Sequence, residues 1–160
     1  MEIRFLLFVL LLAATAIISF AYAIWRGRND QQILRSILQS SPIPTFVIST
    51  DRKILYWNRA LEGLSGIRAE EVLGTDQQWR AFYSSPRSCM ADLIISNKID
   101  HSDSLYAGKV TTSKVLKYAY EVTEFFPDIG EKGKWFRITA TNIRDSSGKT
   151  FGAMETLEDI

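Results

Sequence analysis

A long run without charge near the amino terminus limits what this chain can fold into more than any other feature of its sequence. From Phe5 to Trp25 no side chain is charged, and only Thr15, Ser19 and Tyr22 relieve the apolar residues. About 21 residues of helix measure roughly 31 Å, close to the thickness of the hydrocarbon core of a bilayer. Because a backbone in lipid must satisfy its own hydrogen bonds, the run predicts a transmembrane helix in contact with membrane lipid.

The charges on either side of this run predict its orientation. Arg26, Arg28 and Arg35 follow it, whereas Arg4 precedes it. The excess of basic residues on the carboxyl side favours a single-pass membrane protein with a cytoplasmic carboxyl-terminal domain. A cleaved signal peptide is the alternative, because Ala21-Tyr22-Ala23 resembles a small-x-small cleavage site.

A second, shorter helix is predicted next to the membrane. Residues 27–30 (Gly-Arg-Asn-Asp) can break and restart a helix, which divides the anchor at 1–28 from a juxtamembrane helix at 29–41. Apolar residues then recur at spacings of three and four, and they form one stripe: Ile33, Leu34, Ile37 and Leu38. The stripe is a candidate dimer seam, and it equally fits packing against the chain's own domain.

Charge and cysteine usage exclude several classes of function. Lysine and arginine total 19 against 18 aspartate and glutamate, and the isoelectric point is near 7.8. This balance does not indicate a nucleic-acid partner, which would require a basic stripe. Cys89 is the single cysteine, so no internal disulfide and no zinc site of the cysteine type can form. We expect Cys89 to be a small buried or half-buried apolar residue.

Strands at both ends of the remaining chain enclose a helical middle. Thr45–Ile48 and Ile54–Trp57 are predicted to form a hairpin about the turn 51–53. Asn58 then begins a helix that Gly66 ends. The last third of the chain predicts three strands: Glu121–Phe126, Lys134–Arg144 and Thr150–Glu158. A hairpin turn at 145–149 joins the second of these strands to the third.

The order of these features carries a family resemblance. The marks are Ile48–Ala60, Leu64–Gly66, Glu70–Gly74, Trp135–Phe136, Arg144–Lys149, Gly152–Glu155 and Glu158–Ile160. With these marks, residues 42–160 resemble a PAS sensor domain, and the block from Trp79 to Leu93 is similar to a subgroup in bacterial and archaeal membrane sensors. The resemblance implies an α+β PAS fold, with a five-stranded antiparallel sheet in the order 2-1-5-4-3 and helices on one face. In this chain one transmembrane helix would precede that fold.

The resemblance also implies a function. Such a domain would be a membrane-anchored sensory, ligand-binding and dimerisation module, and would relay a signal to a histidine kinase or diguanylate cyclase domain or protein. Signal output would leave near Glu155 and Asp159. The chain stops at Ile160 without an effector, so we expect either a fragment of a longer receptor or a separate effector protein. The alternative function is a ligand-free interaction scaffold whose core is filled by its own side chains.

No set of residues predicts catalysis or metal binding, and we expect no enzymatic activity within residues 1–160. Candidate pocket residues are Trp79, Phe82, Tyr83 and Arg87, and the spacing of four residues between the last two predicts one helical face for both. An arginine beside aromatic rings suits an anionic or aromatic ligand, although packing of a helix on a sheet explains the same pattern. By the resemblance, His101 is a weak candidate haem ligand. The cofactor therefore stays open between none, haem and a small organic ligand.

Overall fold

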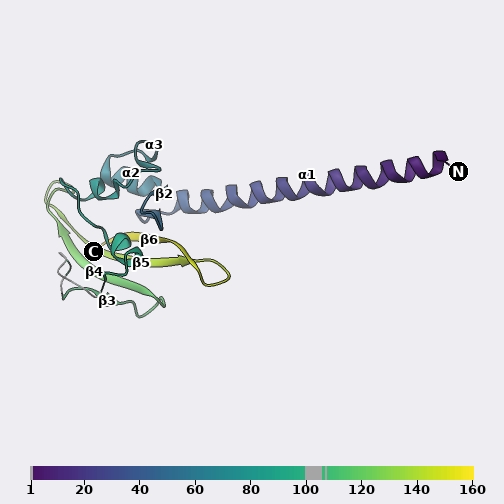
Figure 1. Ribbon diagram of the computed structural model, residues 1–160. Coiled ribbons are helices and arrows are strands. Elements are labelled where there is room, and N and C mark those ends of the chain that lie inside the picture. Colours follow the sequence, from purple (N-terminus) through teal and green to yellow (C-terminus); the bar gives the residue numbers. More distant parts are fainter. Residues whose placement is uncertain (1, 100–105, 107) are drawn as a thin grey trace. The chain divides into compact units, whose positions relative to one another are not determined.

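The computed structural model describes the backbone of residues 2–99, 106 and 108–160, and the side chains of these residues from Thr15 onward. The chain divides into two units, Met1–Gln39 and Ser40–Ile160. One long helix, α1 (Glu2–Ser40), makes up the first unit. The second unit contains an antiparallel sheet and its short helices (Figure 1).

The helix break expected at residues 27–30 is absent, because α1 continues through them. A glycine inside a helix costs only about 1 kcal/mol, which does not by itself end a long helix. Asn29 and Asp30 act as caps only where the preceding residues leave the helix. The juxtamembrane segment 29–41 is therefore the last part of α1 down to Ser40, and not a separate helix.

The expected transmembrane helix is also wrong. Within the described residues, no helix combines the length and the apolar character that crossing a bilayer requires. Side chains of α1 are described from Thr15, and three charged residues, Arg26, Arg28 and Asp30, fall within the first 18 residues from that point. Charged side chains inside a bilayer are expensive. The single-pass membrane location that depended on this helix is corrected with it.

The sheet is antiparallel and follows the order β2-β1-β6-β5-β4-β3. Its strands are β1 (Thr45–Ser49), β2 (Ile54–Trp57), β3 (Thr111–Thr112), β4 (Ala119–Phe126), β5 (Lys134–Arg144) and β6 (Thr150–Asp159). The five longer strands are those expected from the sequence. The predicted five-stranded sheet is nevertheless wrong, because β3 pairs with Tyr120 and Glu121 of β4 and adds a sixth strand at the edge.

Short helices pack against the inner face of this sheet. They are α2 (Arg59–Ser65), α3 (Ala69–Val72), the 3₁₀ helix η1 (Gln78–Ala81) and α4 (Met90–Ile95). Alternate residues of the central strands point inward, where they are buried against the apolar residues of α4. These strand residues are Phe46, Ile48, Phe136, Ile138, Ala153 and Leu157. The core therefore lies between one sheet face and the helices.

Asn58 fixes the junction between the first hairpin and α2. Its Oδ1 accepts hydrogen bonds from the Leu61 N–H at 3.0 Å and from the Thr45 N–H at 2.9 Å. Its Nδ2 donates to the Ile43 carbonyl at 2.8 Å. One fully buried side chain thus caps the helix and satisfies backbone groups beside β1, as the predicted helix start at this residue requires. Gly66, in a left-handed conformation, ends α2 as expected.

We predict opposite effects for two glycine-to-alanine substitutions. A methyl group at Gly152, on β6, would overlap the backbone carbonyl oxygen of Ile48 on β1, whereas one at Gly63, inside α2, meets nothing within 4 Å. Gly152→Ala should lower the free energy of unfolding by about 1–3 kcal/mol, and Gly63→Ala should raise it by about 0.5–1 kcal/mol. Urea denaturation measures both. Equal effects of the two substitutions would contradict the close approach of β6 to β1.

Candidate functional site

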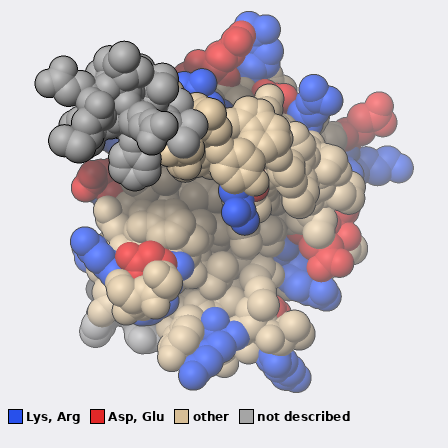
Figure 2. Space-filling model, turned by 90° about the vertical axis from the view of Figure 1, so that its right-hand side faces the viewer, with Lys and Arg blue, Asp and Glu red and all other residues tan. Residues whose placement is uncertain are grey.

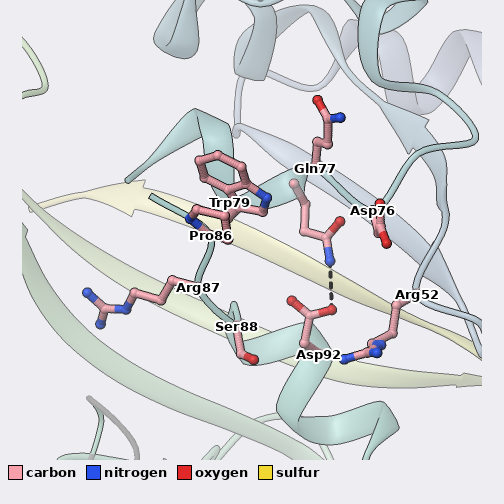
Figure 3. Close-up of a pocket in the computed structure, with 9 residues that line it drawn as sticks. Arg52, Asp76, Gln77, Trp79, Pro86, Arg87, Ser88 and Asp92 are labelled. Carbon is pink, nitrogen blue, oxygen red and sulfur yellow. Dashed lines mark hydrogen bonds between the residues drawn. The ribbon is translucent and has the colours of Figure 1, made fainter. Parts of the chain in front are cut away.

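A pocket of about 600 Å³ opens where the β1–β2 turn, η1 and the start of α4 meet. Arg52 comes from the turn, and the segment into η1 supplies a run of polar residues and Trp79. Figure 3 shows Trp79 and Pro86 on one side of this pocket and Arg52 with Asp76 on the other. Its lining residues are Arg52, Asp76, Gln77, Gln78, Trp79, Pro86, Arg87, Ser88 and Asp92.

A buried polar pair forms the inner end of the pocket. Gln78 is 3% exposed and Asp92 is 5% exposed. The Gln78 Nε2 donates to Asp92 Oδ1 at 2.6 Å, drawn as the dashed line in Figure 3. The Cys89 backbone N–H donates to Asp92 Oδ2 at 2.9 Å. Burial raises the pKa of the Asp92 carboxyl despite these bonds. Among the described residues, Gln78 Oε1 has no hydrogen-bond partner.

The charged outer side of the pocket contains Arg52 and Asp76. Arg52 has a φ of 59°, a left-handed conformation that is uncommon for residues with a side chain. Asp76 is paired with Lys53 at 3.4 Å, and hydrogen bonds from its own backbone and from Lys53 lower the pKa of its carboxyl. In the described part of the chain, Arg52 belongs to no ion pair.

Arg87 points away from the pocket and enters a second polar cluster (Figure 3). Its guanidinium lies 4.0 Å from the centre of the Tyr83 ring and donates to Glu124 at 3.0 Å. The Tyr83 hydroxyl contacts the Tyr106 hydroxyl at 2.9 Å and donates to Glu124 at 3.1 Å. Burial raises the pKa of both tyrosines, so both hydroxyls keep their protons. The cluster connects the segment before α4 to β4.

Glu155 connects α4 to the middle of the sheet. Its side chain is buried on β6, and Oε2 accepts a hydrogen bond from the Ala91 backbone N–H at 2.8 Å. Burial raises the pKa of the Glu155 carboxyl to about 8, and the negative charges of Asp92 and Glu124 act in the same direction, while the bond from Ala91 opposes them. The carboxyl is therefore largely protonated at neutral pH.

The predicted pocket residues do not form one site. Trp79 and Arg87 line the pocket of Figure 3, whereas Phe82 is buried in the core and Tyr83 belongs to the polar cluster. Tyr83 and Arg87 do meet, but not for the expected reason, because no helix runs between residues 82 and 89. An irregular segment that contains Pro86 brings the two side chains together.

The other predicted residues lie in different places. Ile33, Leu34 and Ile37 are exposed on α1, and Leu38 is half-buried. Asp159 is at the end of β6 and pairs with Lys134 of β5. His101 lies outside the described residues. Cys89 is fully buried, as expected, and burial raises the pKa of its thiol. Within the described ranges, no group of three or more acidic, histidine or cysteine side chains could hold a metal ion.

Sequence reasoning missed Gln78, Asp92 and Arg52 as pocket residues and Glu124 as the partner of Arg87. Gln78 carries no signal, since a glutamine beside a tryptophan fits many loops. For Glu155, which the family resemblance assigns to signal output, the sequence does indicate the buried position. Alternation places it on the same strand face as Ala153 and Leu157, which predicts a carboxylate inside the core.

The face of the molecule in Figure 2 gives, among its described residues, no competing site for a polyanion. On the face in Figure 2, lysine and arginine side chains are interspersed with aspartate and glutamate, rather than gathered in one area. Such a face offers no basic stripe that could follow a nucleic-acid backbone.

Comparisons with known proteins agree with this geometry. A family model described as the PAS fold matches residues 32–85. The PAS domain of BvgS from Bordetella pertussis is 15% identical, with a TM-score of 0.53 over 82% of this chain and 85% of that one. The PAS domain of an HTR-like protein from Haloarcula marismortui is 12% identical, with a TM-score of 0.50 over 88% and 99%. A LOV protein from Rhodobacter sphaeroides is 9% identical, with a TM-score of 0.50 over 83% and 68%.

No curated protein matches the chain. The family model matches about a third of the chain, and the similar solved structures share the fold of the unit Ser40–Ile160, which is therefore a PAS fold. PAS domains are typically sensory, non-catalytic modules, and the comparisons reveal no catalytic family.

We predict that the half-buried Arg87–Glu124 pair stabilises the fold more than an exposed pair does. Arg87 and Glu124 are 20% and 18% exposed, against 48% and 59% for Arg137 and Glu158. Arg87→Met removes a charged hydrogen bond and a cation over Tyr83, and should lower the free energy of unfolding by about 1–3 kcal/mol. Arg137→Met should lower it by less than about 1 kcal/mol.

Urea denaturation of both variants, of Glu124→Gln, and of Arg87→Met combined with Glu124→Gln provides the measurement. The double variant should lose less than the sum of its single substitutions, because the two residues interact directly. If Arg87→Met and Arg137→Met lower the free energy of unfolding equally, the polar cluster does not stabilise this domain as described.

Proposed function

We propose that this PAS domain is a sensory module in which a small ligand, bound in the pocket of Figure 3, alters α4 and thereby β6. The signal would leave through the end of β6, near Glu155 and Asp159, toward a downstream kinase or cyclase domain or protein. The fold supports a sensory role, because PAS domains are typically sensory modules.

One observation carries the proposed route. Asp92 lines the pocket, and the residue before it, Ala91, donates its backbone N–H to Glu155 of β6 at 2.8 Å. A shift of α4 caused by a ligand at Asp92 would therefore act on a hydrogen bond inside the sheet. Because this bond is buried, breaking it would leave polar groups unsatisfied, which makes the two elements move together.

Hydrogen exchange on the full chain tests this route. Compounds from a metabolite panel that raise the melting temperature are first identified, since a ligand bound to the folded state stabilises it. Each should then change the exchange protection of β6 amides in the native chain, and change it less in Glu155→Leu, which cannot accept the Ala91 N–H. Stabilising compounds that leave β6 protection unchanged in the native chain would contradict the route.

A second function, a ligand-free interaction scaffold, is favoured by the packing of the interior. The space between sheet and helices is filled by aromatic rings whose centres lie 5.7–6.1 Å apart: Phe46, Trp57, Phe82, Tyr83, Phe126 and Phe136. A ligand would have little room among these rings. A metabolite panel that produces no stabilisation at all would favour this scaffold over the sensor.

We further propose that the α1 stripe of Ile33, Leu34, Ile37 and Leu38 is a homodimer seam. Leu34 is exposed on α1, and so is Gln32, on the opposite face of the same helix. Leu34→Lys should weaken self-association about tenfold or more, whereas the control Gln32→Lys should not, because a charge in an apolar seam is desolvated without a partner. Sedimentation equilibrium measures both, and equal association constants would exclude the seam.

We predict that Glu155 makes the stability of the domain depend on pH. Its carboxyl has a folded-state pKa of about 8 against 4.5 for an unperturbed glutamate. Because the carboxyl pKa is raised, the folded state binds more protons than the unfolded state. The stabilisation that Glu155 contributes is therefore fully present below pH 4.5 and is lost as the pH rises through about 8. The stability that this carboxyl contributes below pH 4.5 exceeds its contribution well above pH 8 by roughly 5 kcal/mol.

Glu155→Gln should therefore flatten the dependence of unfolding free energy on pH between 4.5 and 8. The control Glu158→Gln changes an exposed carboxyl on the same strand and should leave the slope as in the native chain. Urea denaturation at several pH values provides the curves. A native-like slope in Glu155→Gln would show that this carboxyl is already ionised in the fold.

A further inference from the structure

One of the residues that line the pocket carries an unsatisfied hydrogen-bond acceptor. Gln78 is almost fully buried, and its Oε1 has no hydrogen-bond partner among the described residues. Gln78 Nε2 donates to Asp92 at 2.6 Å, and with an ionised Asp92 the opposite amide orientation would place two oxygen atoms together. A buried acceptor without a partner is costly, so a bound molecule that offers an N–H or O–H group gains by satisfying it.

The surroundings of this acceptor favour a donor with positive charge. Asp92 lies beside Gln78, and burial opposes ionisation of its carboxyl. Both of its oxygens already accept hydrogen bonds, and these bonds and the charge of Arg52 oppose the effect of burial on its pKa, so a further positive charge beside it would favour the ionised carboxylate. A protonated amine at Gln78 Oε1 would stabilise the Asp92 carboxylate.

The other side of the pocket favours a negative group. Arg52 lines it and, within the described residues, forms no ion pair, although its charge favours ionisation of the Asp92 and Asp76 carboxyls. Asp76 is already paired with Lys53 at 3.4 Å. A guanidinium binds a carboxylate through two parallel N–H groups. The Arg52 guanidinium could bind a carboxylate in this way. The residue has a φ of 59°, a left-handed backbone conformation in which asparagine or glycine would be less strained than arginine.

We propose that the pocket binds a zwitterionic α-amino acid, whose ammonium group donates to Gln78 Oε1 and whose carboxylate pairs with the Arg52 guanidinium. Trp79 and Pro86, on the opposite side from Arg52 in Figure 3, provide an apolar wall for its side chain. The assignment rests on the proposed sensory function and specifies its ligand class.

The first measurement compares amino acids with analogues that lack one charged group. The melting temperature of the full chain is recorded with each of the common L-amino acids, and with the N-acetyl and the decarboxylated form of each one that stabilises it. At least one amino acid should raise the melting temperature as its concentration rises. Both of its analogues should bind roughly tenfold or more weakly, because each loses one charge-assisted hydrogen bond.

Variants assign the two groups to the two residues. Arg52→Asn removes the guanidinium and suits the left-handed backbone, so the folded state should be kept or slightly stabilised while the amino acid binds roughly tenfold or more weakly. Lys149→Asn is the control, because it removes one exposed positive charge from the β5–β6 hairpin, outside the pocket. Gln78→Met should also weaken binding, and Arg52→Asn keeps the test valid if that variant folds poorly.

The outcomes separate this inference from the proposed function. Equal weakening by Arg52→Asn and Lys149→Asn, or tighter binding of the analogues, would overturn the assignment. So would stabilisation only by neutral or purely anionic metabolites, although the sensory function would then stand. Stabilisation by no compound of any class would overturn both the assignment and the sensory proposal. An amino acid that depends on Arg52 but leaves β6 unchanged in hydrogen exchange would support the site and contradict the signalling route.

Discussion

The hydrogen bond between the Ala91 N–H and the Glu155 carboxyl joins the two layers of this domain. Apolar residues of α4 also pack on the sheet, but several nearby arrangements could satisfy these contacts. The hydrogen bond from the Ala91 N–H to the buried Glu155 carboxyl allows far fewer arrangements of α4 on the sheet, because any other position of α4 leaves this N–H unsatisfied. β6 lies between β1 and β5, so this contact is made in the interior of the sheet and not at an edge.

Most of the fold follows from short-range features of the sequence. Asn58 and Gly66 begin and end α2 through contacts with near neighbours, and Asp145 closes the last hairpin by accepting from Ser147 and Lys149. These features can be predicted because each depends on residues a few positions away. The errors arose where local signals compete. The possible break at 27–30 did not interrupt α1, and the two-residue strand β3 is too short for any periodicity to reveal.

The candidate site was much less predictable, since its contacts span long stretches of chain. Gln78 and Asp92 are 14 positions apart, Arg87 and Glu124 are 37 apart, and Arg52 reaches the pocket from a turn. Aromatic residues near Trp79 indicated the right neighbourhood but could not distinguish pocket from core. The fold places Phe82 among the core rings and leaves Trp79 beside the pocket. Only the tertiary arrangement decides between these two environments.

The position of Cys89 gives the domain an internal reporter of its own motions. This lone thiol is fully buried at the residue before α4, within the same interface that Glu155 completes. A thiol reagent cannot reach it in the closed state, and its raised pKa keeps it as the unreactive protonated form. The rate at which a reagent labels Cys89 therefore follows how often α4 lifts from the sheet. Opening of this interface can thus be timed in the native chain without introducing any probe.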